Sequence, residues 1–290
     1  MRLSRDLLGT PLKPGTMRWT ARDCALYALG IGAGQADPLR ELEFTTGRGQ
    51  VVYPTFGVVP GGVVGVGHLL ELLGDAVDAS TVLHGEQTCE QLEPLPTQAD
   101  VVITGRISAI WDKGSSTVIE TTTDTSDGDS GIAYCRTTAS LFFRGVGGWG
   151  GERGPAGAAR GAPERAPDRV LAVGTRPDQA LLYRLSGDTN PLHVDPDAAA
   201  RAGFERPILH GLCVYGVVGR VLLSEYAAAD PRRFGSLKGR FSRPTWPGDT
   251  LTIESWHEPD GVLFQVRNQR GDTVMTNGSF TVRPYGGTDA

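Results

Sequence analysis

The sequence has few cysteines, no excess of positive charge and no long uninterrupted apolar run. Its four cysteines, Cys24, Cys89, Cys135 and Cys213, lie far apart and never form the CxxC pairs typical of a zinc site or a redox dithiol. We therefore expect reduced thiols in a cytosolic protein. Lysine and arginine number 28 against 33 aspartate and glutamate residues, a net charge of −5. No cationic surface dominates, so nucleic acid is not an expected partner.

Signals for export or membrane insertion are also missing from the pattern. Residues 1–15 carry charges inside what would have to be the apolar run of a signal peptide. The longest apolar stretch, at about 63–73, is interrupted by glycines and His68, whereas a helix that spans a bilayer needs about 20 apolar residues. We expect a soluble, cytoplasmic protein without a membrane partner.

The chain of 290 residues repeats one order of segments. Residues 26–29 match 182–185, and residues 54–70 match 207–223, so the two copies lie about 150 residues apart. A third pair, which begins at Pro94 and at Pro244, follows in the same order. We divide the chain into an N-terminal repeat, a linker and a C-terminal repeat, at residues 1–145, 146–170 and 171–290.

Each half is expected to contain one long apolar helix followed by strands. The helices are expected at about 56–74 and 211–227, and they are apolar on most faces. Hairpins beside such a helix imply an antiparallel sheet curled around it, an α+β architecture. β-branched, alternating residues between turn signals predict strands at 100–110, 116–123, 132–143, 250–256, 262–268 and 273–282.

The linker is rich in glycine, alanine and proline, which is typical of a flexible connection that could fold over a site. Gly145, Gly147 and Gly150 spell G-x-G-x-x-G after an expected strand. Gly154 and Pro155 follow where the helix of a dinucleotide-binding loop should begin. We therefore interpret the segment as a connection rather than a nucleotide site.

The stretch from Tyr183 to His193 is the most informative for chemistry. Gly187 permits an unusual backbone angle and Pro191 prevents helix propagation, so Asp188 and His193 should lie on an irregular loop. Directly after it, an aspartate and a proline are expected to begin a short helix that holds the loop. A carboxylate and an imidazole on such a loop could share one water molecule, remove a proton from it and return one elsewhere.

A further group follows at the start of the second apolar helix. The N–H of Gly211 would be an unpaired donor at the positive end of the helix dipole, suited to a developing oxyanion. Each residue alone also has a structural explanation: a turn carboxylate for Asp188, a buried histidine for His193 and close packing for Gly211. Together, a water, an acid/base pair and an oxyanion donor favour addition of water to a polarised double bond.

These blocks resemble the MaoC-like, (R)-specific enoyl-CoA hydratases, also called the hydratase 2 family. The resemblance lies in residues 183–193, in Pro-Ile-Leu-His-Gly-Leu at 207–212 and in residues 240–249. In the first half, residues 50–56 and 83–87 are similar to the noncatalytic half of two-repeat members. The resemblance implies a double hotdog fold, in which each half wraps an antiparallel sheet around a long helix.

The resemblance also implies site residues. The corresponding positions of the first half hold Gly32 and Val58, so one active site per chain is expected. The implied reaction is the reversible syn hydration of a trans-2-enoyl-CoA to a (3R)-3-hydroxyacyl-CoA in fatty acyl metabolism. The implied catalytic residues are Asp188 and His193 as the acid/base pair, Asn190 as a supporting amide and Gly211 as the oxyanion donor.

The substrate would be an acyl thioester of coenzyme A or of acyl-carrier protein. No metal or redox cofactor is implied, and the resemblance suggests a homodimer. Coenzyme A carries phosphates, so basic residues should flank the entrance, although each is also explained as an ordinary solvated charge. The candidates for substrate contact are Arg184, Lys238, Arg240, Arg243 and His84, of which His84 is better explained by a structural role than by a catalytic one.

Other functions remain open at this point because a fold does not determine chemistry. A hotdog thioesterase would release free thiol, whereas a hydratase would not. A noncatalytic acyl-CoA-binding subunit would bind the enoyl thioester without turnover. A dinucleotide-dependent oxidoreductase depends on the glycine pattern alone.

Overall fold

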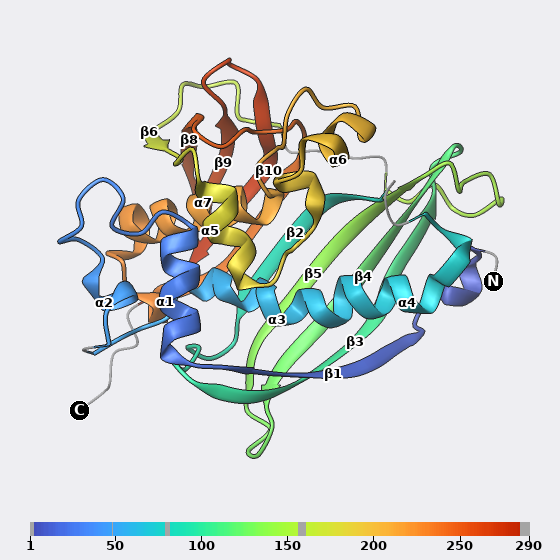
Figure 1. The fold of residues 1–290 in the computed structure, drawn as a ribbon, viewed down its shortest axis with the longest axis horizontal. Coiled ribbons are helices and arrows are strands. Elements are labelled where there is room, and N and C mark those ends of the chain that lie inside the picture. The colour runs from blue at the N-terminus through green and yellow to red at the C-terminus, as the bar shows by residue number, and fades with distance from the viewer. Residues whose placement is uncertain (1–2, 48, 79–81, 156–160, 285–290) are drawn as a thin grey trace.

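Ten strands hydrogen-bond into one continuous antiparallel sheet in the computed structural model, which describes residues 3–47, 49–78, 82–155 and 161–284. Across the sheet the strands run in the order β1-β3-β4-β5-β2-β7-β10-β9-β8-β6 (Figure 1). Each half of the chain contributes five adjacent strands. Replacing β1 to β5 by β6 to β10 converts one half into the mirror order of the other, so the repeat expected from the sequence is confirmed as a double hotdog.

The two halves meet where β2 pairs with β7. This pairing is antiparallel and runs from Glu86 opposite Arg240 to Glu90 opposite Ser236. Because the seam is an ordinary strand pair, main-chain hydrogen bonds continue from one half into the other. The strands are β1 Pro11–Trp19, β2 Val82–Gln91, β3 Ala99–Asp112, β4 Ser116–Asp127, β5 Ala133–Arg144, β6 Arg169–Gly174, β7 Phe234–Phe241, β8 Thr250–Glu258, β9 Gly261–Arg267 and β10 Thr273–Val282.

Six of these strands were expected, and β1, β2, β6 and β7 were not. β1 contains two prolines and a glycine, and its register shifts between Leu12 and Gly15, which hides its alternation. Proline is tolerated there because β1 is an edge strand. The alternation of β2 is hard to recognise because many of its residues are polar.

The helices are α1 Ala21–Gly30, α2 Leu42–Thr45, η2 Pro54–Gly57, α3 Val58–Gly62, η3 Val63–His68, α4 Leu69–Leu73, α5 Gln179–Tyr183, η6 Arg184–Ser186, η7 Pro191–His193, α6 Pro196–Arg201 and α7 Gly211–Ala227, with short turns η1 Arg5–Leu7, η4 Gly74–Ala76 and η8 Pro231–Arg233.

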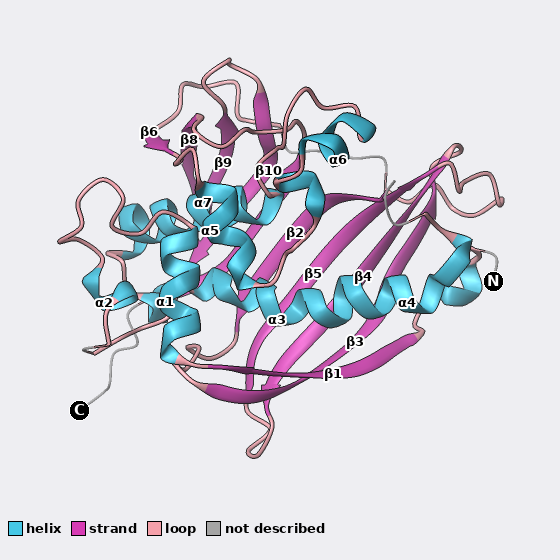
Figure 2. Ribbon diagram, viewed as in Figure 1, coloured by secondary structure: helices cyan, strands magenta, loops and turns pink. Residues whose placement is uncertain are grey.

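The long helix of the first half, from η2 to α4, crosses the strands of its sheet and changes geometry along its length (Figure 2). The turn η3 is a π-helix. A Cβ on Gly61 would overlap Thr137, and one on Gly65 would lie 3.1 Å from Thr121 Oγ1. The same hydroxyl donates to the Gly65 carbonyl at 3.0 Å. The glycines therefore let this helix lie directly on the sheet.

This run also has the length and apolar character of a possible membrane span. An 18-residue window within residues 54–76 has a mean hydropathy of 1.6, and half of this window is buried inside the protein. Here the run is the central helix of a hotdog repeat, which is apolar because strands cover it.

The long helix of the second half, α7, is regular from Gly211 to Ala227 and buried on most faces. Two of its glycines, Gly216 and Gly219, face the other half of the chain. A Cβ on Gly216 would lie 2.9 Å from Tyr27 Oη, and one on Gly219 would lie 2.5 Å from Thr55 Cγ2. Close packing of α7 on the first half therefore joins the two repeats in one hydrophobic core.

The described part of the linker is held against the first half. The Asp112 carboxylate accepts hydrogen bonds from the N–H groups of Gly148 at 2.9 Å and Gly150 at 2.8 Å. Trp149 Nε1 donates to Thr117 Oγ1 at 2.9 Å. The expectation of a flexible segment over the site is therefore corrected for residues 145–155, since these amides have partners on the β3–β4 hairpin. No helix follows in residues 151–155, so this part lacks the helix that a dinucleotide loop needs.

The four cysteines are free and buried. Burial raises the pKa of the Cys24 and Cys135 thiols to about 12. Thiols with such values carry little thiolate at neutral pH and are poor nucleophiles.

Candidate active site

The loop after α5 begins with a backbone conformation that favours glycine. The helical segment α5–η6 ends at Gly187, whose φ is +123°. Three residues later, Asn190 caps the turn η7, because its Oδ1 accepts from the Leu192 N–H at 3.0 Å. The Asn190 N–H donates to Asp188 Oδ1 at 3.2 Å. Local hydrogen bonds therefore orient both the carboxylate and the amide side chain of this loop.

The far end of the loop is held by the short helix α6. Asp195 accepts from the N–H groups of Asp197 at 2.8 Å and Ala198 at 3.2 Å, as an N-cap does. Pro196 is the first helical residue, and Gly203 follows the helix with φ +85°. The expected cap is confirmed, and the loop is anchored on both sides.

Three side chains come together at this loop: Asp188, His193 and His210. Ligand atoms from the three lie within 4.8 Å of one another. A water molecule makes hydrogen bonds of about 2.8 Å, so a single water can bridge the carboxylate and an imidazole at this separation. Asp188 is partly exposed, whereas both histidines are buried. The pair expected from the sequence, Asp188 and His193, therefore faces one small space.

The hydrogen bonding of His193 determines which of its nitrogens is available. Nδ1 lies 2.9 Å from the carbonyl oxygen of Ile208. A carbonyl only accepts, so we assign the hydrogen of the neutral ring to Nδ1 and a free lone pair to Nε2. Burial lowers the pKa of His193, and the Ile208 carbonyl and the Asp188 charge oppose that shift without cancelling it. His193 is therefore neutral near pH 7, and its Nε2 atom can accept a proton.

His210 is a site residue to which the sequence assigned no role. It is fully buried and stands directly before α7 as its N-cap residue. Its ring stacks on that of His193, with centroids 3.8 Å apart, and its Nε2 atom lies 3.2 Å from the carbonyl oxygen of Asp188. Burial, then the neighbouring His193, lowers the pKa of His210 to about 4. The only sequence signal was its place between Leu209 and Gly211 in the second block.

Gly211 is the first residue of α7, as expected. The first main-chain bonds of the helix are donated by Cys213 and Val214 to the His210 carbonyl, so the Gly211 N–H lies ahead of them at the positive end of the helix dipole. A Cβ at this position would lie 3.3 Å from Phe241 Cε1. The glycine thus serves close packing and leaves an N–H directed away from the helix.

The first half contributes His84 to the same region. The register of β2 against β5 shifts between His84 and Glu86, a bulge of the kind that redirects side chains near active sites. The His84 ring meets Phe241 edge-on, with centroids 5.2 Å apart. Burial lowers the pKa of His84 to about 4, and the Asp188 charge acts in the opposite direction. Its Nε2 atom is buried without a hydrogen-bond partner among the described residues.

Of the basic candidates, Arg184 lies beside the loop. Its charge contributes to the low pKa of His210, and its Nε atom is buried without a partner in the described part of the chain. Arg184 belongs to η6, one turn before the catalytic loop. Its position therefore fits contact with an anionic group that approaches Asp188 and His193.

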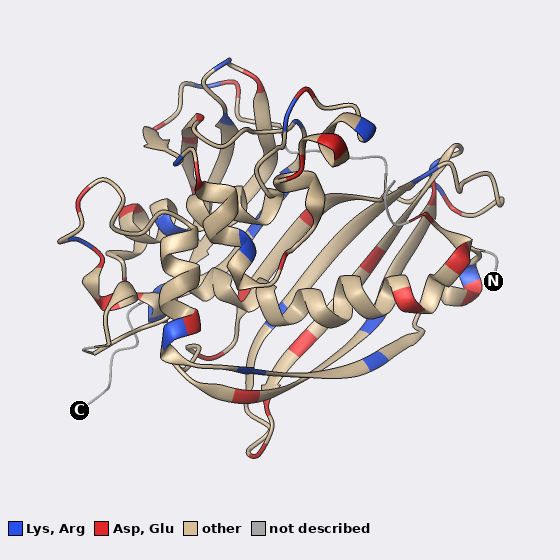
Figure 3. Cartoon of the chain, in the orientation of Figure 1, with Lys and Arg blue, Asp and Glu red and all other residues tan. Residues whose placement is uncertain are grey.

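The other basic candidates, Lys238, Arg240 and Arg243, lie on β7 and in the loop after it, not on the loop that carries Asp188. Side chains alternate along β7, and the Leu237 side chain meets α7, so Lys238 and Arg240 point to the opposite face of the sheet. Lys238 forms an ion pair with Glu86 at 2.8 Å. Arg243 belongs to the loop after β7, and its Nη1 atom lies 3.7 Å from Oδ1 of Asp272. Acidic and basic residues are interspersed over the whole chain (Figure 3).

Asp188, His193 and His210 also offer ligand atoms within 4.8 Å of one another, the spacing of a possible metal site. His193 Nδ1 and His210 Nε2 face main-chain carbonyl oxygens. A cation could use only the other ring nitrogens and the Asp188 carboxylate. The two rings are stacked, with 29° between their planes.

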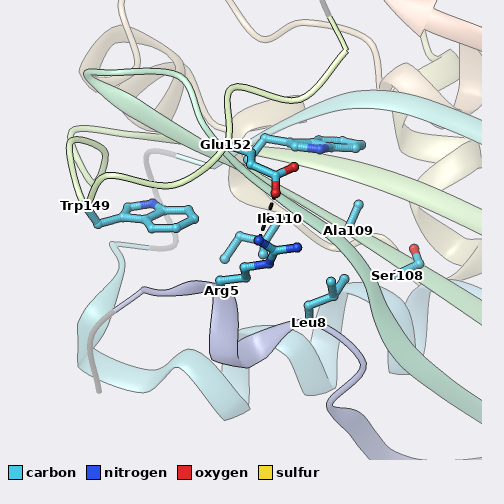
Figure 4. Close-up of a pocket in the computed structure, with 8 residues that line it drawn as sticks. Arg5, Leu8, Ser108, Ala109, Ile110, Trp149 and Glu152 are labelled. Atoms are coloured by element: carbon cyan, nitrogen blue, oxygen red, sulfur yellow. Dashed lines mark ion pairs between the residues drawn. The ribbon is translucent and has the colours of Figure 1, made fainter.

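A cavity of about 220 Å³ lies apart from this loop, at the other end of the first half (Figure 4). An ion pair of 2.9 Å between Arg5 and Glu152 crosses it. None of the catalytic candidates lines it. The remaining lining residues are Leu8, Ser108, Ala109, Ile110, Trp111 and Trp149.

Two family models match the chain, one in each half. Residues 17–145 match the family model of the MFE-2 hydratase 2 N-terminal domain, and residues 158–278 match that of the MaoC like domain. Enoyl-CoA hydratase ChsH3 of Mycobacterium tuberculosis is 42% identical over 281 residues, which cover 93% of this chain and 95% of that protein.

Two further relatives extend the comparison. Peroxisomal multifunctional enzyme type 2 of Mus musculus is 39% identical over 287 residues, 97% of this chain but 38% of the mouse protein. The chain thus spans well under half of that enzyme. The crystal structure of a MaoC-like dehydratase from Phytophthora capsici superposes with a TM-score of 0.84 at 32% identity, covering 98% of this chain and 99% of the other.

Proposed function

The chain belongs to the MaoC-like dehydratase family in its two-repeat hydratase 2 form, and from this premise we propose that it adds water reversibly to trans-2-enoyl-CoA. The product is a (3R)-3-hydroxyacyl-CoA of fatty acyl metabolism. One observation carries the proposal: Asp188 and His193 lie within reach of a single water molecule, next to the N-terminus of α7.

Substrate polarisation is assigned to Gly211. The thioester carbonyl oxygen accepts a hydrogen bond from the Gly211 N–H, which withdraws electrons from the conjugated C2–C3 double bond. Removal of one donor of this kind typically raises a barrier by about 3 to 4 kcal/mol. The helix dipole adds stabilisation to the enolate that forms.

Proton transfer is assigned to the loop. Water held between the Asp188 carboxylate and His193 Nε2 attacks C3, and His193 takes the proton that the water loses. The resulting imidazolium returns a proton to C2 on the same face, so one water is added in syn fashion and the enzyme is regenerated. Asn190 has its oxygen engaged in the η7 cap, so its NH2 group is the part that contacts the new hydroxyl.

Substrate recognition draws on both halves. Arg184 contacts the phosphates of the carrier, coenzyme A or the phosphopantetheine of acyl-carrier protein, and His84 contacts the thioester end of the substrate. No metal or redox cofactor has a step to perform, because the base, the acid and the oxyanion donor all belong to the chain. A cytoplasmic homodimer remains part of the proposal.

The test is turnover of crotonyl-CoA, followed by loss of the enoyl absorbance and by chiral analysis of the product. Asp188→Asn and His193→Gln should each lower kcat by about 10²- to 10⁴-fold with an unchanged fold by circular dichroism. Asp178→Asn, at an exposed carboxylate paired with Arg176, is the control and should retain activity. Near-normal turnover in either active-site variant would reject the assignment, and release of free thiol would identify a thioesterase.

A further inference from the structure

His210 connects the parts of the site that the proposed reaction uses. Its Nε2 atom lies 3.2 Å from the Asp188 carbonyl oxygen, its ring covers one face of His193, and the next residue along the chain is Gly211. The backbone of Asp188, the ring of His193 and the first residue of α7 are therefore connected through one buried imidazole.

We propose that His210 is a positioning residue, held as the neutral Nε2–H tautomer, that fixes the catalytic loop relative to the N-terminus of α7. The inference depends on the proposed hydration reaction and extends it. The Asp188 carbonyl can only accept, so the hydrogen must be on Nε2 of the neutral ring. The ring then donates to the loop while its own backbone caps the helix.

The burial of His210 indicates a function beyond filling space. Its Nδ1 atom is buried without a partner among the described residues. An unpaired buried polar atom costs about 1 to 3 kcal/mol, and an aromatic ring without nitrogen would occupy this volume without that cost. The imidazole is therefore explained by the bond from Nε2 and by its stack on His193.

The charged and titratable groups that face His210 support a neutral ring. They are His193, Asp188, Arg184 and, with ring centroids 5.1 Å away, Tyr183. Protonation of His210 would place a cation against His193 and near Arg184, with only Asp188 in opposition. A neutral His210 lets His193 alone change its proton during the reaction.

Two substitutions separate the hydrogen bond from the stack. His210→Gln keeps an N–H donor near the position of Nε2 but removes the ring that shields His193. His210→Phe keeps the ring and removes the donor. His68→Gln is the matched control, because His68 is a partly exposed histidine of the first half whose Nδ1 atom lies 2.6 Å from the Lys13 carbonyl.

We expect the two variants to differ in the size of the kcat loss and in the pH dependence of crotonyl-CoA hydration. His210→Phe should lower kcat by about 100-fold with KM changed less than about threefold, because the loop is misplaced rather than the substrate released. His210→Gln should lower kcat by about tenfold and move the acid limb of kcat/KM upward toward 6.5, because water reaches the exposed face of His193. His68→Gln should change neither quantity.

The outcomes are decisive. If the wild-type chain does not hydrate crotonyl-CoA, the proposed function fails independently of His210. If the wild type is active and both His210 variants keep kcat within about threefold with an unchanged acid limb, the positioning role is overturned. Should either variant fail to fold, ¹⁵N NMR of the wild-type imidazoles at pH 7 decides: the Nε2–H tautomer at His210 supports the proposal and the Nδ1–H tautomer overturns it.

Discussion

In the first half two glycines of the central helix pack on threonines of its own sheet, whereas in the second half two glycines of α7 pack on the first half. Gly61 and Gly65 lie against Thr137 and Thr121, while Gly219 of α7 lies against Thr55 of η2. The same device, a missing Cβ, thus serves helix–sheet contact in one repeat and contact between repeats in the other. Duplicated elements can keep their topology while the partners of their small residues change.

The loops that follow the first helix of each repeat also differ in the residues that they carry and in what those residues bind. In the second half this loop carries Asp188 and His193. In the first half it runs from Ile31 to Glu41, and Arg220 of α7 binds it: Nη1 lies 3.0 Å from both carboxylate oxygens of Glu41, and Nε donates to the Ile31 carbonyl at 3.1 Å. One copy of the loop carries the proposed acid/base pair, and the other anchors α7, the helix that begins at Gly211.

The largest effect, on kcat, is expected when the residues at the equivalent positions 188 and 32 of the two loops are exchanged. Asp188→Gly should lower kcat for crotonyl-CoA by about 10²- to 10⁴-fold, because the water loses its carboxylate. Gly32→Asp in the first half should leave kcat within about threefold, since Val58 stands where the oxyanion glycine would be. A second active site in the Gly32→Asp variant, seen as a doubled kcat, would show that the halves are chemically equivalent.

Removal of the anchoring arginine should have the next largest effect, on stability. Arg220→Met leaves Glu41 without its partner in a mostly buried position, where the two side chains are 13% and 21% exposed. We expect a loss of about 3 kcal/mol in the free energy of unfolding at pH 7. Arg136→Met breaks a similar pair with Asp124 on the exposed sheet, 2.7 Å long, and should cost less than about 1 kcal/mol. Urea denaturation of both variants measures the difference.

The same anchor has a pH dependence with a defined sign. Burial raises the pKa of Glu41, but Arg220 and hydrogen bonds from Gly34 and Tyr53 lower it more, so the net shift is below 4.5. The stabilisation is therefore fully present above pH 4.5 and is lost as the pH falls through the folded value. The gap between wild type and Arg220→Met should close in that range, and a gap that persists in acid would show that the anchor is not electrostatic.

The smallest effect on stability is expected for two adjacent glycines of α3, in the long helix of the first half. A Cβ at Gly61 would overlap Thr137 and lie 3.0 Å from Thr123 Oγ1, whereas nothing lies within 4 Å of one at Gly62. Gly61→Ala should destabilise the protein by about 1 to 3 kcal/mol. Gly62→Ala should stabilise it by up to about 1 kcal/mol, since alanine loses less backbone entropy. Equal urea midpoints for the two variants would show that the helix is not pressed onto its sheet.

Much of the fold and part of the site could be predicted because their signals are local. The hairpins from β3 to β5 and from β8 to β10 follow from alternation and turn residues. The loop at Asp188 follows from Gly187 and Pro191, which restrict the backbone at their own positions. The anchored linker was not predictable, because the carboxylate of Asp112 that collects its amides lies 36 residues before Gly148.

The sequence by itself determined the repeat, the order of elements and the placing of a carboxylate and an imidazole on one capped loop, since these depend on neighbours within a few residues. Only the tertiary structure decided that His84 reaches the site from the other half and that His210 stacks on His193. It also decided that Arg220 binds Glu41 across 179 residues of chain. Such contacts depend on which faces of distant elements meet, and that is set by the β2–β7 seam and by the packing of α7.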